Sequence, residues 1–545
     1  MLRPAPALLL ALLAATQPAA TQPAATQPAA TQPAADTFRL VAADFGVVAR
    51  ADVDNRAALQ RAIDRAWYQR QTEDRRAIAL VELPCHRPFA RSGEAIGYAG
   101  SLVLRDSVLL AGCGGTRLAQ RADDLGQAFW PVVEAYELGA PQETRLRLLD
   151  GALDRRRPDG RPEVHRIQAA PDVALIGARD VVFDGNWEGN LDAYRRFPAE
   201  LRESYFRNGV AWSGPMINNH GGVAVRCAPD GGPGALGQFT RVAVVGYGAT
   251  GLLGHACARF ELTDVLVADA LYNHTIYNAD GVWRNVTVAG FAWTHLIVQH
   301  GTTAENLVYW RAAPNPIGRR NPDLVNVRGG SFYVRGFYAD TRLPGRAPER
   351  PDDAEQLFSN APTAEVDVSG LVWVAGRGGV LASGGVRFAL DGARVHAAHS
   401  ISALHAAWGP AGTYALRDVV VESEQPGRMV FVDRTGGGAW QLDRVRMTAG
   451  YAGEGAALEV ERGTGQPRSA TFRAAITRSV IRGLRAGGAV AVGGGAWGHH
   501  PRLCADTATR EASPGLVPYP PHPECAALLV EPIRGHPAEH RPSGP

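Results

Sequence analysis

The sequence predicts an all-β fold, a solenoid of stacked parallel strands, and three observations point to it. Short runs of β-branched and aromatic residues recur after residue 172 and are interrupted by Gly, Asn and Asp. The runs are spaced at nearly regular intervals, and they show no helical periodicity. An amphipathic segment near the amino terminus is suited to cover the open end of such a stack.

The composition limits the classes of function. The chain has 545 residues, and 56 basic side chains against 54 acidic ones leave a net charge of +2. No charge excess therefore favours nucleic acid or an anionic membrane as a partner. Every basic residue is an arginine, which excludes mechanisms that need a lysine base or a lysine Schiff base.

The segment before the predicted domain resembles an export signal followed by a spacer. Arg3 precedes a short apolar run, which is the layout of a signal peptide over residues 1–15 and is too short for a membrane span. Residues 16–36 contain Thr-Gln-Pro-Ala-Ala four times, and we expect a disordered spacer there because large apolar groups are missing. We expect a secreted or periplasmic protein that is a monomer and has no membrane span.

The next segment predicts a helical lid. The acidic stretch from Asp52 to Asn55 can cap a helix that runs from Arg56 to about Tyr68. Four of its residues form one apolar stripe at helical spacing, namely Leu59, Ala62, Ile63 and Ala66. Three short strands follow, ending near residues 83, 104 and 111.

Two sets of repeats support the solenoid. The first contains four versions of one strand, which start at Arg241, Asp264, Asn285 and Asn306, at successive intervals of 23, 21 and 21 in the numbering. The residues that follow three of these starts, Val265, Val286 and Leu307, should stack directly on one another, one coil apart. The second set is headed by Leu371, Val395, Val419 and Val445, at successive intervals of 24, 24 and 26. The alternative is a β-sandwich with accidental periodicity.

The cysteines fit an exported protein with up to three disulfides. There are six, at positions Cys85, Cys113, Cys227, Cys257, Cys504 and Cys525. We favour a Cys504–Cys525 disulfide, because it would hold the Pro-rich tail of residues 501–545, although sequence alone does not determine the pairing. Buried free thiols are the alternative for each.

A family resemblance rests on the motifs at the start of the domain. Asp44-Phe45-Gly46, the acidic cap, the Ala-rich helix, the strand ending in Leu83-Pro84 and the later Gly112-Cys113-Gly114 resemble the opening of the pectate-lyase-like superfamily. Asp184-Gly185-Asn186 resembles the turn at which those proteins gain regular coils. The resemblance implies a single-stranded right-handed parallel β-helix over residues 37–500 with an N-terminal capping α-helix.

The same resemblance implies a class of function. Members of the superfamily act mostly on acidic polysaccharides, which they bind in a groove along the coils. It therefore implies a lyase or hydrolase for uronate-containing glycans of the pectin or alginate kind, and Ca²⁺ is the one cofactor that it suggests. The ordered motifs of polygalacturonases and the Asp-Pro-His-Glu motif of alginate epimerases are absent. The alternative is a non-catalytic, cell-surface glycan binder or adhesin.

The segment from residue 269 to residue 300 contains the main candidate site. A shift by the interval of the first repeat set places three pairs of side chains above each other: Tyr272 and Trp293, His274 and His295, and Asn278 and Gln299. On an outward face, the aromatic rings and amides would bind sugars, and the two imidazoles would act as acid and base. Asp269 and Asp280, in the flanking turns, would then orient an imidazole or hold a metal ion.

The opposite orientation is equally open at this point. Ile276 and Ile297 belong to the same expected face as the two histidines, and stacked identical side chains are common inside β-solenoids. We also predict that Trp212 and His220 bind substrate from a long excursion between coils, although a well-packed loop is the alternative there. We assign no metal ligand.

Overall fold

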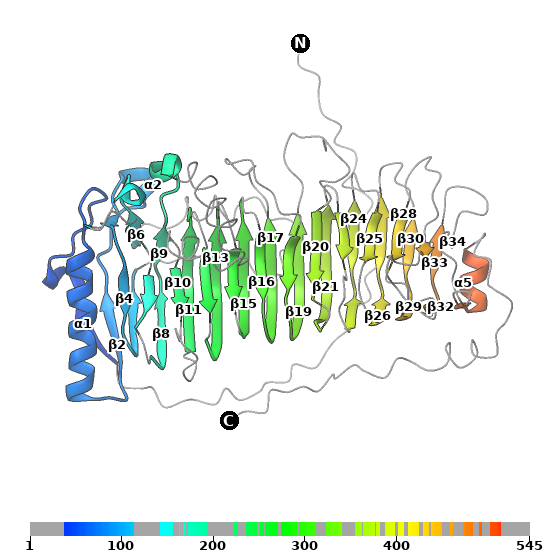
Figure 1. Cartoon of the computed structure of the whole chain (residues 1–545), viewed down its shortest axis with the longest axis horizontal. Helices are drawn as coiled ribbons and strands as arrows, with labels where there is room; N and C mark the ends of the chain where they lie inside the picture. The colour runs from blue at the N-terminus through cyan, green and yellow to red at the C-terminus, as the bar shows by residue number, and fades with distance from the viewer. Residues whose placement is uncertain are drawn as a thin grey trace, which may run out of the picture.

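The computed structural model shows a long stack of parallel strands with an α-helix at each end (Figure 1). It describes residues 37–113 and, with gaps, residues 142–193 and 223–513. Over these residues the strands form two parallel sheets, a large sheet of 22 strands and a small sheet of 13. Connections between parallel strands are right-handed, and the fold is the predicted single-stranded right-handed parallel β-helix.

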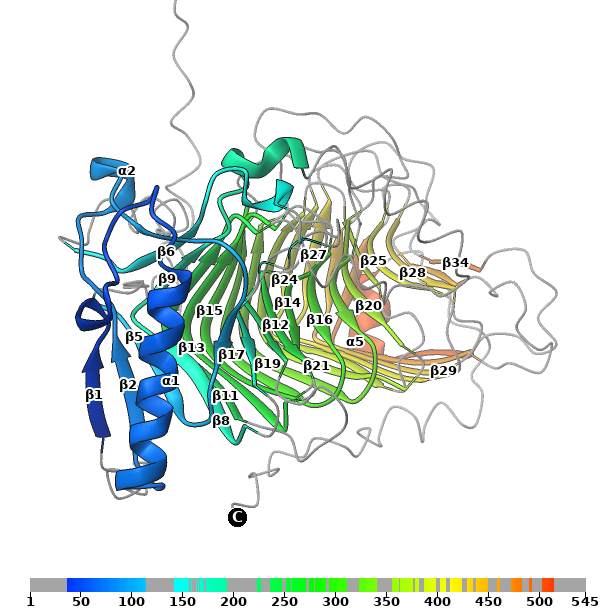
Figure 2. The ribbon, with the colours of Figure 1, turned by 60° about the vertical axis from the view of Figure 1, so that its left-hand side comes forward.

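The helix α1 (Arg56–Glu73) covers the amino-terminal end of the stack (Figure 2). The stripe predicted from the sequence lies against the first coils, and Leu59, Ala62 and Ile63 are 0% exposed. The cap differs in detail from the expectation. Asn55 makes no side-chain capping bond in the helix, and its carboxamide instead binds the backbone of Val48, Val53 and Gly97.

The helix continues beyond Tyr68 and ends at Glu73. Arg70 explains the extension, because its buried guanidinium donates to the carbonyl oxygen of Ala77 at 2.8 Å and to the carboxylate of Asp106 at 3.0 Å. A charged side chain that is buried needs such partners, and these contacts fix the last turn of the helix.

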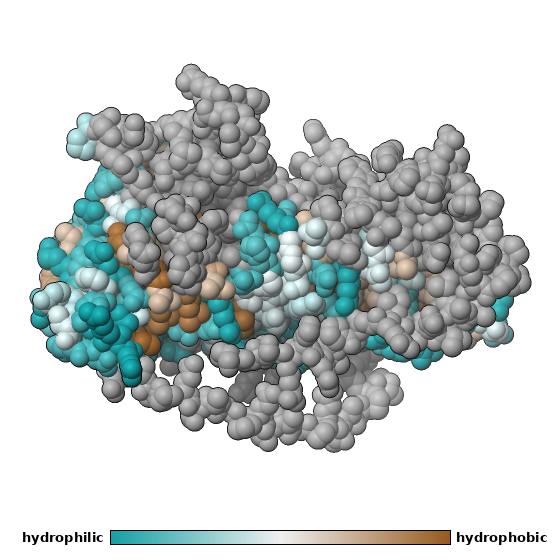
Figure 3. Space-filling model, turned by 60° about the horizontal axis from the view of Figure 1, so that its bottom comes forward, coloured by the Kyte–Doolittle hydropathy of each residue, from teal (hydrophilic) through white to brown (hydrophobic). Residues whose placement is uncertain are grey.

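The first coils consist of short elements. They are β1 (Thr37–Val41), η1 (Ala42–Phe45), β2 (Ile78–Glu82), α2 (Phe89–Ser92), β3 (Ile96–Tyr98), β4 (Leu102–Leu104), β5 (Val108–Ala111), β6 (Arg145–Leu148), η3 (Ala152–Asp154), β7 (Ile167–Ala169), β8 (Leu175–Arg179), β9 (Val182–Asp184) and η4 (Glu188–Asn190). Toward this end of the stack, one face of the molecule displays apolar side chains, whereas the surface further along is more hydrophilic (Figure 3).

Longer strands form the large sheet in the regular coils. They are β11 (Leu236–Val245), β13 (Arg259–Ala268), β15 (Gly281–Ala289), β17 (Thr302–Trp310), β19 (Ser331–Asp340) and β21 (Glu365–Ala375). In later coils each is divided in two, as β23 (Arg387–Asp391) and β24 (Arg394–Ala397), β26 (Gly412–Arg417) and β27 (Val420–Ser423), β29 (Gly438–Asp443) and β30 (Arg446–Thr448), and β32 (Phe472–Thr477) and β33 (Val480–Arg482).

The small sheet continues from β4 and β7. Its further strands are β10 (Val223–Arg226), β12 (Leu252–His255), β14 (His274–Asn278), β16 (Thr294–Val298), β18 (Asp323–Val327), β20 (Glu355–Asn360), β22 (Gly378–Leu381), β25 (Ser402–Ala407), β28 (Met429–Arg434), β31 (Leu458–Val460) and β34 (Val490–Val492). At the far end, β35 (Arg502–Ala505) pairs with β32 and is followed by α5 (Thr507–Ala512).

The register of the large sheet confirms the first repeat set. Val265 pairs with Val286, and Val286 pairs with Leu307. All three side chains are at most 1% exposed and belong to one hydrophobic core that runs through the stack. The repeat interval of this set therefore measures one full coil.

The second repeat set is shifted from the expected intervals. Val395 pairs with Trp373 in the preceding coil and with Val421 in the following one, and not with Leu371 and Val419, so the two predicted intervals of 24 are wrong. Val420 pairs with Arg446, so the last predicted interval is confirmed. Each error is a shift by two positions. Because side chains alternate with a period of two, the predicted faces are unaffected.

One residue in a left-handed conformation turns each of the four strands β11, β13, β15 and β17 through a corner. The φ angles of Arg241, Asp264, Asn285 and Asn306 are 51°, 54°, 52° and 56°, and asparagine and aspartate tolerate this region better than most residues. Their side chains form a ladder along the stack. Nδ2 of Asn285 donates to Oδ1 of Asp264 at 2.8 Å, and Nδ2 of Asn306 donates to Oδ1 of Asn285 at 3.0 Å.

The Asp184-Gly185-Asn186 motif forms a buried, hydrogen-bonded turn at the start of the regular coils. Asn186 donates to the carbonyl oxygen of Leu148 and accepts a 2.6 Å bond from Arg147, whose guanidinium also pairs with Asp184 at 2.6 Å. The Asn186 side chain is 2% exposed. All of its polar groups therefore serve the fold, which explains why this turn marks the beginning of regular winding.

A disulfide joins Cys85 to Cys113. Cys257 and Cys504 are also disulfide-bonded, whereas Cys227 and Cys525 lie outside the described residues, so the Cys504–Cys525 pairing stays a prediction. Among the helices of the described part, none is both long enough and apolar enough to cross a membrane.

Candidate functional site

The small sheet contains the strand of the predicted histidines, but its register differs from the prediction. His274 pairs with Thr294, and Asn278 pairs with Val298. The expected stacking of His274 on His295, and of Asn278 on Gln299, is therefore wrong by one residue. A shift of one residue in a strand exchanges the two faces of a sheet, so positions 274 and 295 are not direct neighbours in the small sheet.

The lengths of two turns explain this offset. Positions 269–273 separate β13 from β14, whereas the shorter segment 290–293 separates β15 from β16. The following turn compensates, with positions 279–280 after β14 and the longer segment 299–301 after β16. The large sheet consequently keeps its repeat interval, while the interval in the small sheet is shorter by one between these coils.

The predicted carboxylates lie in the turns on either side of this strand. Asp280 accepts a 2.7 Å hydrogen bond at Oδ1 from the backbone N–H of Gly301 in the next coil. Asp269 has a φ of 57°, and its carboxylate lies against Gly290, where a Cβ would be 1.9 Å from Oδ1. Both aspartates therefore bring adjacent turns together, and glycine is required at position 290 to admit the carboxylate.

The other predicted site residues are less informative. Tyr272, Trp293, Trp212 and His220 lie outside the described residues. Gln299 is half-buried in the turn after β16. Ile276 and Leu296 form a neighbouring pair and belong to the core of the stack.

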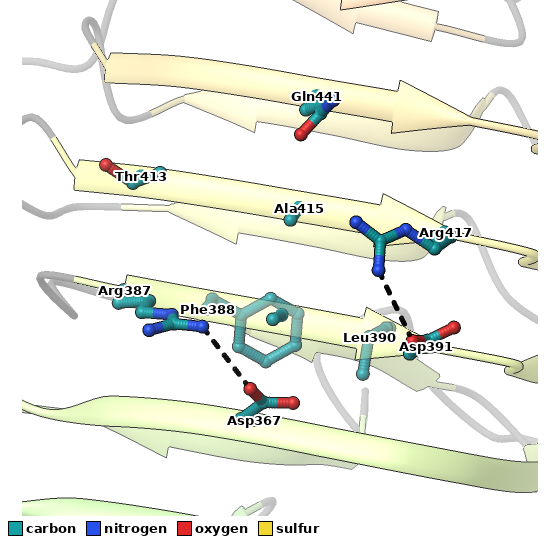
Figure 4. Close-up of a pocket in the computed structure, with 10 residues that line it drawn as sticks. Asp367, Arg387, Phe388, Leu390, Asp391, Thr413, Ala415, Arg417 and Gln441 are labelled. Atoms are coloured by element: carbon teal, nitrogen blue, oxygen red, sulfur yellow. Dashed lines mark hydrogen bonds and ion pairs between the residues drawn. The ribbon is translucent and has the colours of Figure 1, made fainter. Parts of the chain in front are cut away.

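A shallow depression with polar walls lies on the outer face of the large sheet, across β21, β23, β26 and β29 (Figure 4). Ala389 and Ala415 are neighbours in the sheet and form its floor. Asp367 precedes them and Gln441 follows them in the same row along the stack. The small floor residues leave space that the longer side chains around them enclose.

Two arginines and two further polar residues flank the floor. Arg387 is beside Thr413 on one side, and Asp391 is beside Arg417 on the other. The ion pairs in this group are long, with 3.5 Å between Arg387 and Asp367 and 3.6 Å between Arg417 and Asp391. The four charges cancel, so the depression has no net charge, and its charged groups surround a floor that is mostly apolar.

Arg417 has the most available donors of these residues. Its second neighbour in the row, Asp443, already accepts hydrogen bonds from Thr477, Arg444 and Arg478 at 2.5–2.8 Å. Within the described part of the chain, the ion pair of the Arg417 guanidinium is the 3.6 Å contact to Asp391, and Asp418, which binds Arg444, is a further charge nearby. A guanidinium has five N–H donors, and the Arg417 side chain is 39% exposed, so it can bind a ligand.

A tyrosine extends this polar face toward the amino terminus. Tyr333 on β19 neighbours Asp367, and its hydroxyl donates to Glu365 at 3.3 Å. Burial and the adjacent Glu365 raise the pKa of Tyr333 above its usual value. The phenol therefore stays protonated at neutral pH, and its ring offers an aromatic surface of the kind that sugars stack on.

This depression was not predicted, although the sequence contains a signal for it. Residues 387–391, 413–417 and 439–443 read Arg-Phe-Ala-Leu-Asp, Thr-Tyr-Ala-Leu-Arg and Ala-Trp-Gln-Leu-Asp, at equal intervals. In each, an inward aromatic and an inward leucine alternate with three outward residues. In the described residues no three His, Cys, Asp or Glu side chains are arranged to hold a metal ion, so a role for Ca²⁺ stays a prediction.

Comparison with known proteins adds little about activity. No protein-family profile and no curated protein matches the sequence. Among solved structures, the mannuronan C-5 epimerase AlgE4 A-module of Azotobacter vinelandii is similar over 88% of this chain and 99% of that one, with 14% identity and a TM-score of 0.34. An exopolygalacturonase from Thermotoga maritima is similar over 81% and 86%, with 10% identity and a TM-score of 0.30. At these scores neither likeness says anything about what this chain does.

Proposed function

We propose that the protein is an exported, polysaccharide-active β-helix that acts as a lyase or hydrolase on uronate-containing glycans. One observation carries the proposal: the guanidinium of Arg417 has unused donors at the edge of a depression with a small floor. A guanidinium binds a carboxylate through two parallel hydrogen bonds. Thr413 and Gln441, nearby, supply the hydroxyl and amide groups that recognise sugar hydroxyls.

The chemistry of a uronate gives such an arginine two roles. It would hold one sugar of the polymer in place, and it would balance the charge of that sugar's carboxylate. The acid and base predicted from the sequence, His274 and His295 with Asp269 and Asp280, belong to β14, β16 and the turns beside them, several coils from β26, so they would act on a different sugar of the same polymer. Ca²⁺ is the alternative means of neutralising the carboxylate.

A second candidate function is a non-catalytic glycan binder. The one-residue offset between β14 and β16 favours it, because it separates the two histidines that were expected to act together. A binder needs only aromatic surface and polar groups, which the face around Tyr333 and Arg417 supplies. It does not need an acid and a base within hydrogen-bond reach of one bond.

The two functions are separated by incubating the protein with pectin- and alginate-like polysaccharides. Absorbance of unsaturated uronates reports elimination, and new reducing ends without that absorbance report hydrolysis. We expect one of these signals, and we expect it to disappear in His274→Ala and His295→Ala if the histidines act as acid and base. Binding of the glycan with no product of either kind would identify a binder. No binding to any acidic glycan would contradict both functions.

A further inference from the structure

The pairing of Arg417 with Asp391 is longer than the ion pairs at the corners of the large sheet. At the corner of an earlier coil, Arg241 binds Asp180 through two hydrogen bonds of 2.6 and 2.7 Å. Arg417 and Asp391 are direct neighbours in the sheet, yet 3.6 Å separates their closest nitrogen and oxygen. Arg417 thus lies near the carboxylate of Asp391, but its N–H donors are not hydrogen-bonded to that carboxylate.

We propose that Asp391 is an internal competitor for the carboxylate of a bound uronate and thereby determines the specificity of the depression. Without ligand, Asp391 balances the charge of Arg417 and keeps the guanidinium at the edge of the floor (Figure 4). When the ligand binds, its carboxylate replaces Asp391 as the partner of the Arg417 guanidinium, and the Asp391 side chain turns toward solvent. The inference rests on the proposed function, because it names the ligand group that this face recognises.

The exposure of both side chains makes this exchange feasible. Asp391 is 34% exposed and Arg417 is 39% exposed, and an ion pair between solvated groups at long distance contributes little to stability. A ligand carboxylate that meets the guanidinium with two parallel hydrogen bonds forms a stronger contact. Asp443 cannot substitute for the ligand, because Arg444, Arg478 and Thr477 already occupy its oxygens.

The arrangement also predicts which ligands are rejected. A neutral sugar brings no charge to replace Asp391, so the ion pair would persist and reduce access to the guanidinium. The depression should therefore prefer an acidic sugar over its methyl ester, although the empty site has no net charge. The preference would come from the exchange of one carboxylate for another, and not from an excess of positive charge.

The experiment measures binding of a defined oligogalacturonate and of its methyl ester to the full chain by calorimetry. Asp391→Asn removes the competitor, and we expect about two- to fivefold tighter binding of the acid and no gain for the ester. Arg417→Gln should weaken binding of the acid by about tenfold or more. Asp180→Asn is the matched control, since it removes the same charge from an Asp–Arg pair of the same sheet, and it should change neither affinity.

Two results would overturn the inference, and they are distinguishable. If the unaltered protein binds the acid but Asp391→Asn binds it equally or more weakly, Asp391 is an acceptor for the ligand and not its competitor, while the proposed function stands. If the unaltered protein does not bind oligogalacturonate or oligomannuronate at all, the proposed function fails together with the inference. Unfolding midpoints of each variant show whether a loss of binding reflects a loss of folding.

Discussion

Burial of a single histidine gives the amino-terminal region a sensitivity to acid. His86 is 6% exposed, and within the described part of the chain neither of its ring nitrogens has a hydrogen-bond partner. Burial lowers the pKa of His86 below its usual value, and nearby Arg145 lowers it further, against the opposite influence of Glu143 and Glu94. The native form is therefore the neutral imidazole.

This lowered pKa has a definite sign in its effect on stability. In the unfolded chain the histidine takes up a proton near about pH 6.5, whereas the folded chain resists protonation to lower pH. The contribution of neutral His86 is present above about pH 6.5 and is lost as the pH falls through the folded pKa. We expect His86→Leu to lose less stability than the unaltered protein between about pH 7 and pH 5.

Denaturant midpoints across this pH range provide the measurement. The exposed His300 lies in a turn of a regular coil, and His300→Gln serves as the control that leaves the acid sensitivity in place. Equal slopes for His86→Leu and the unaltered protein would show that another group is responsible.

The depression illustrates what sequence could and could not predict for single residues. The alternation in residues 387–391 and 413–417 indicates which side chains point outward, and their regular spacing indicates that they are neighbours. The sequence pattern does not indicate that both carboxylate oxygens of Asp443 already accept hydrogen bonds. That depends on Arg444 and Arg478, which lie at corners of two different coils and reach the same carboxylate.

Among the elements, α1 is the one that covers the amino-terminal end of the stack. Its stripe covers core residues of the first coils, and Leu59 is 0% exposed. We expect Leu59→Ala to lower the free energy of unfolding by about 2–5 kcal/mol, the usual cost of a large-to-small change in a packed core. Tyr68 on the same helix is 54% exposed, and Tyr68→Ala should cost far less.

The loss would have a second consequence that is easy to measure. A solenoid with an uncovered end exposes unpaired strand edges, which favour association. Light scattering on warming should therefore increase for Leu59→Ala and not for Tyr68→Ala. If both variants behave alike in unfolding and scattering, α1 does not cover the end in the way described.

The helix and the first repeat set of the large sheet could be predicted because their signals are local or strictly periodic. The stripe of α1 needs only its own spacing, and the constant repeat interval gives the pairing of Val265 with Val286 directly. The small sheet could not be predicted in the same way. Its register between β14 and β16 depends on the lengths of the turns before and after each strand. These lengths change while their sum stays the same, and the residue pattern of the strands does not reveal them.

At the scale of the whole molecule, the strands of each coil pair with those of the adjacent coils, and large core side chains reach one coil further. Trp283 is 1% exposed in the core and packs edge-on against Phe332 at 6.3 Å between ring centroids. Trp283→Ala should cost about 3–5 kcal/mol. Because stability in a solenoid is a sum of coil and interface contributions, the damage should stay near β13, β15, β17 and β19.

Hydrogen exchange resolved along the chain measures this directly. We expect faster exchange in those four strands and unchanged exchange in β29 and β32. Val282→Ala is the matched control, since Val282 neighbours Trp283 but lies on the outer face. Faster exchange over the entire stack would show that the coils unfold as a single unit.

The glycine corners next to the depression affect how a long ligand can lie there. Gly370 and Gly392, with φ angles of 68° and 69°, occupy the corner positions that asparagine or aspartate holds in earlier coils. They follow Ser369 and Asp391 directly, so no side chain projects where these two strands turn. A polymer bound over Ala389 can consequently continue past these two corners. The depression is therefore open at Gly370 and Gly392 to chains far longer than a single sugar.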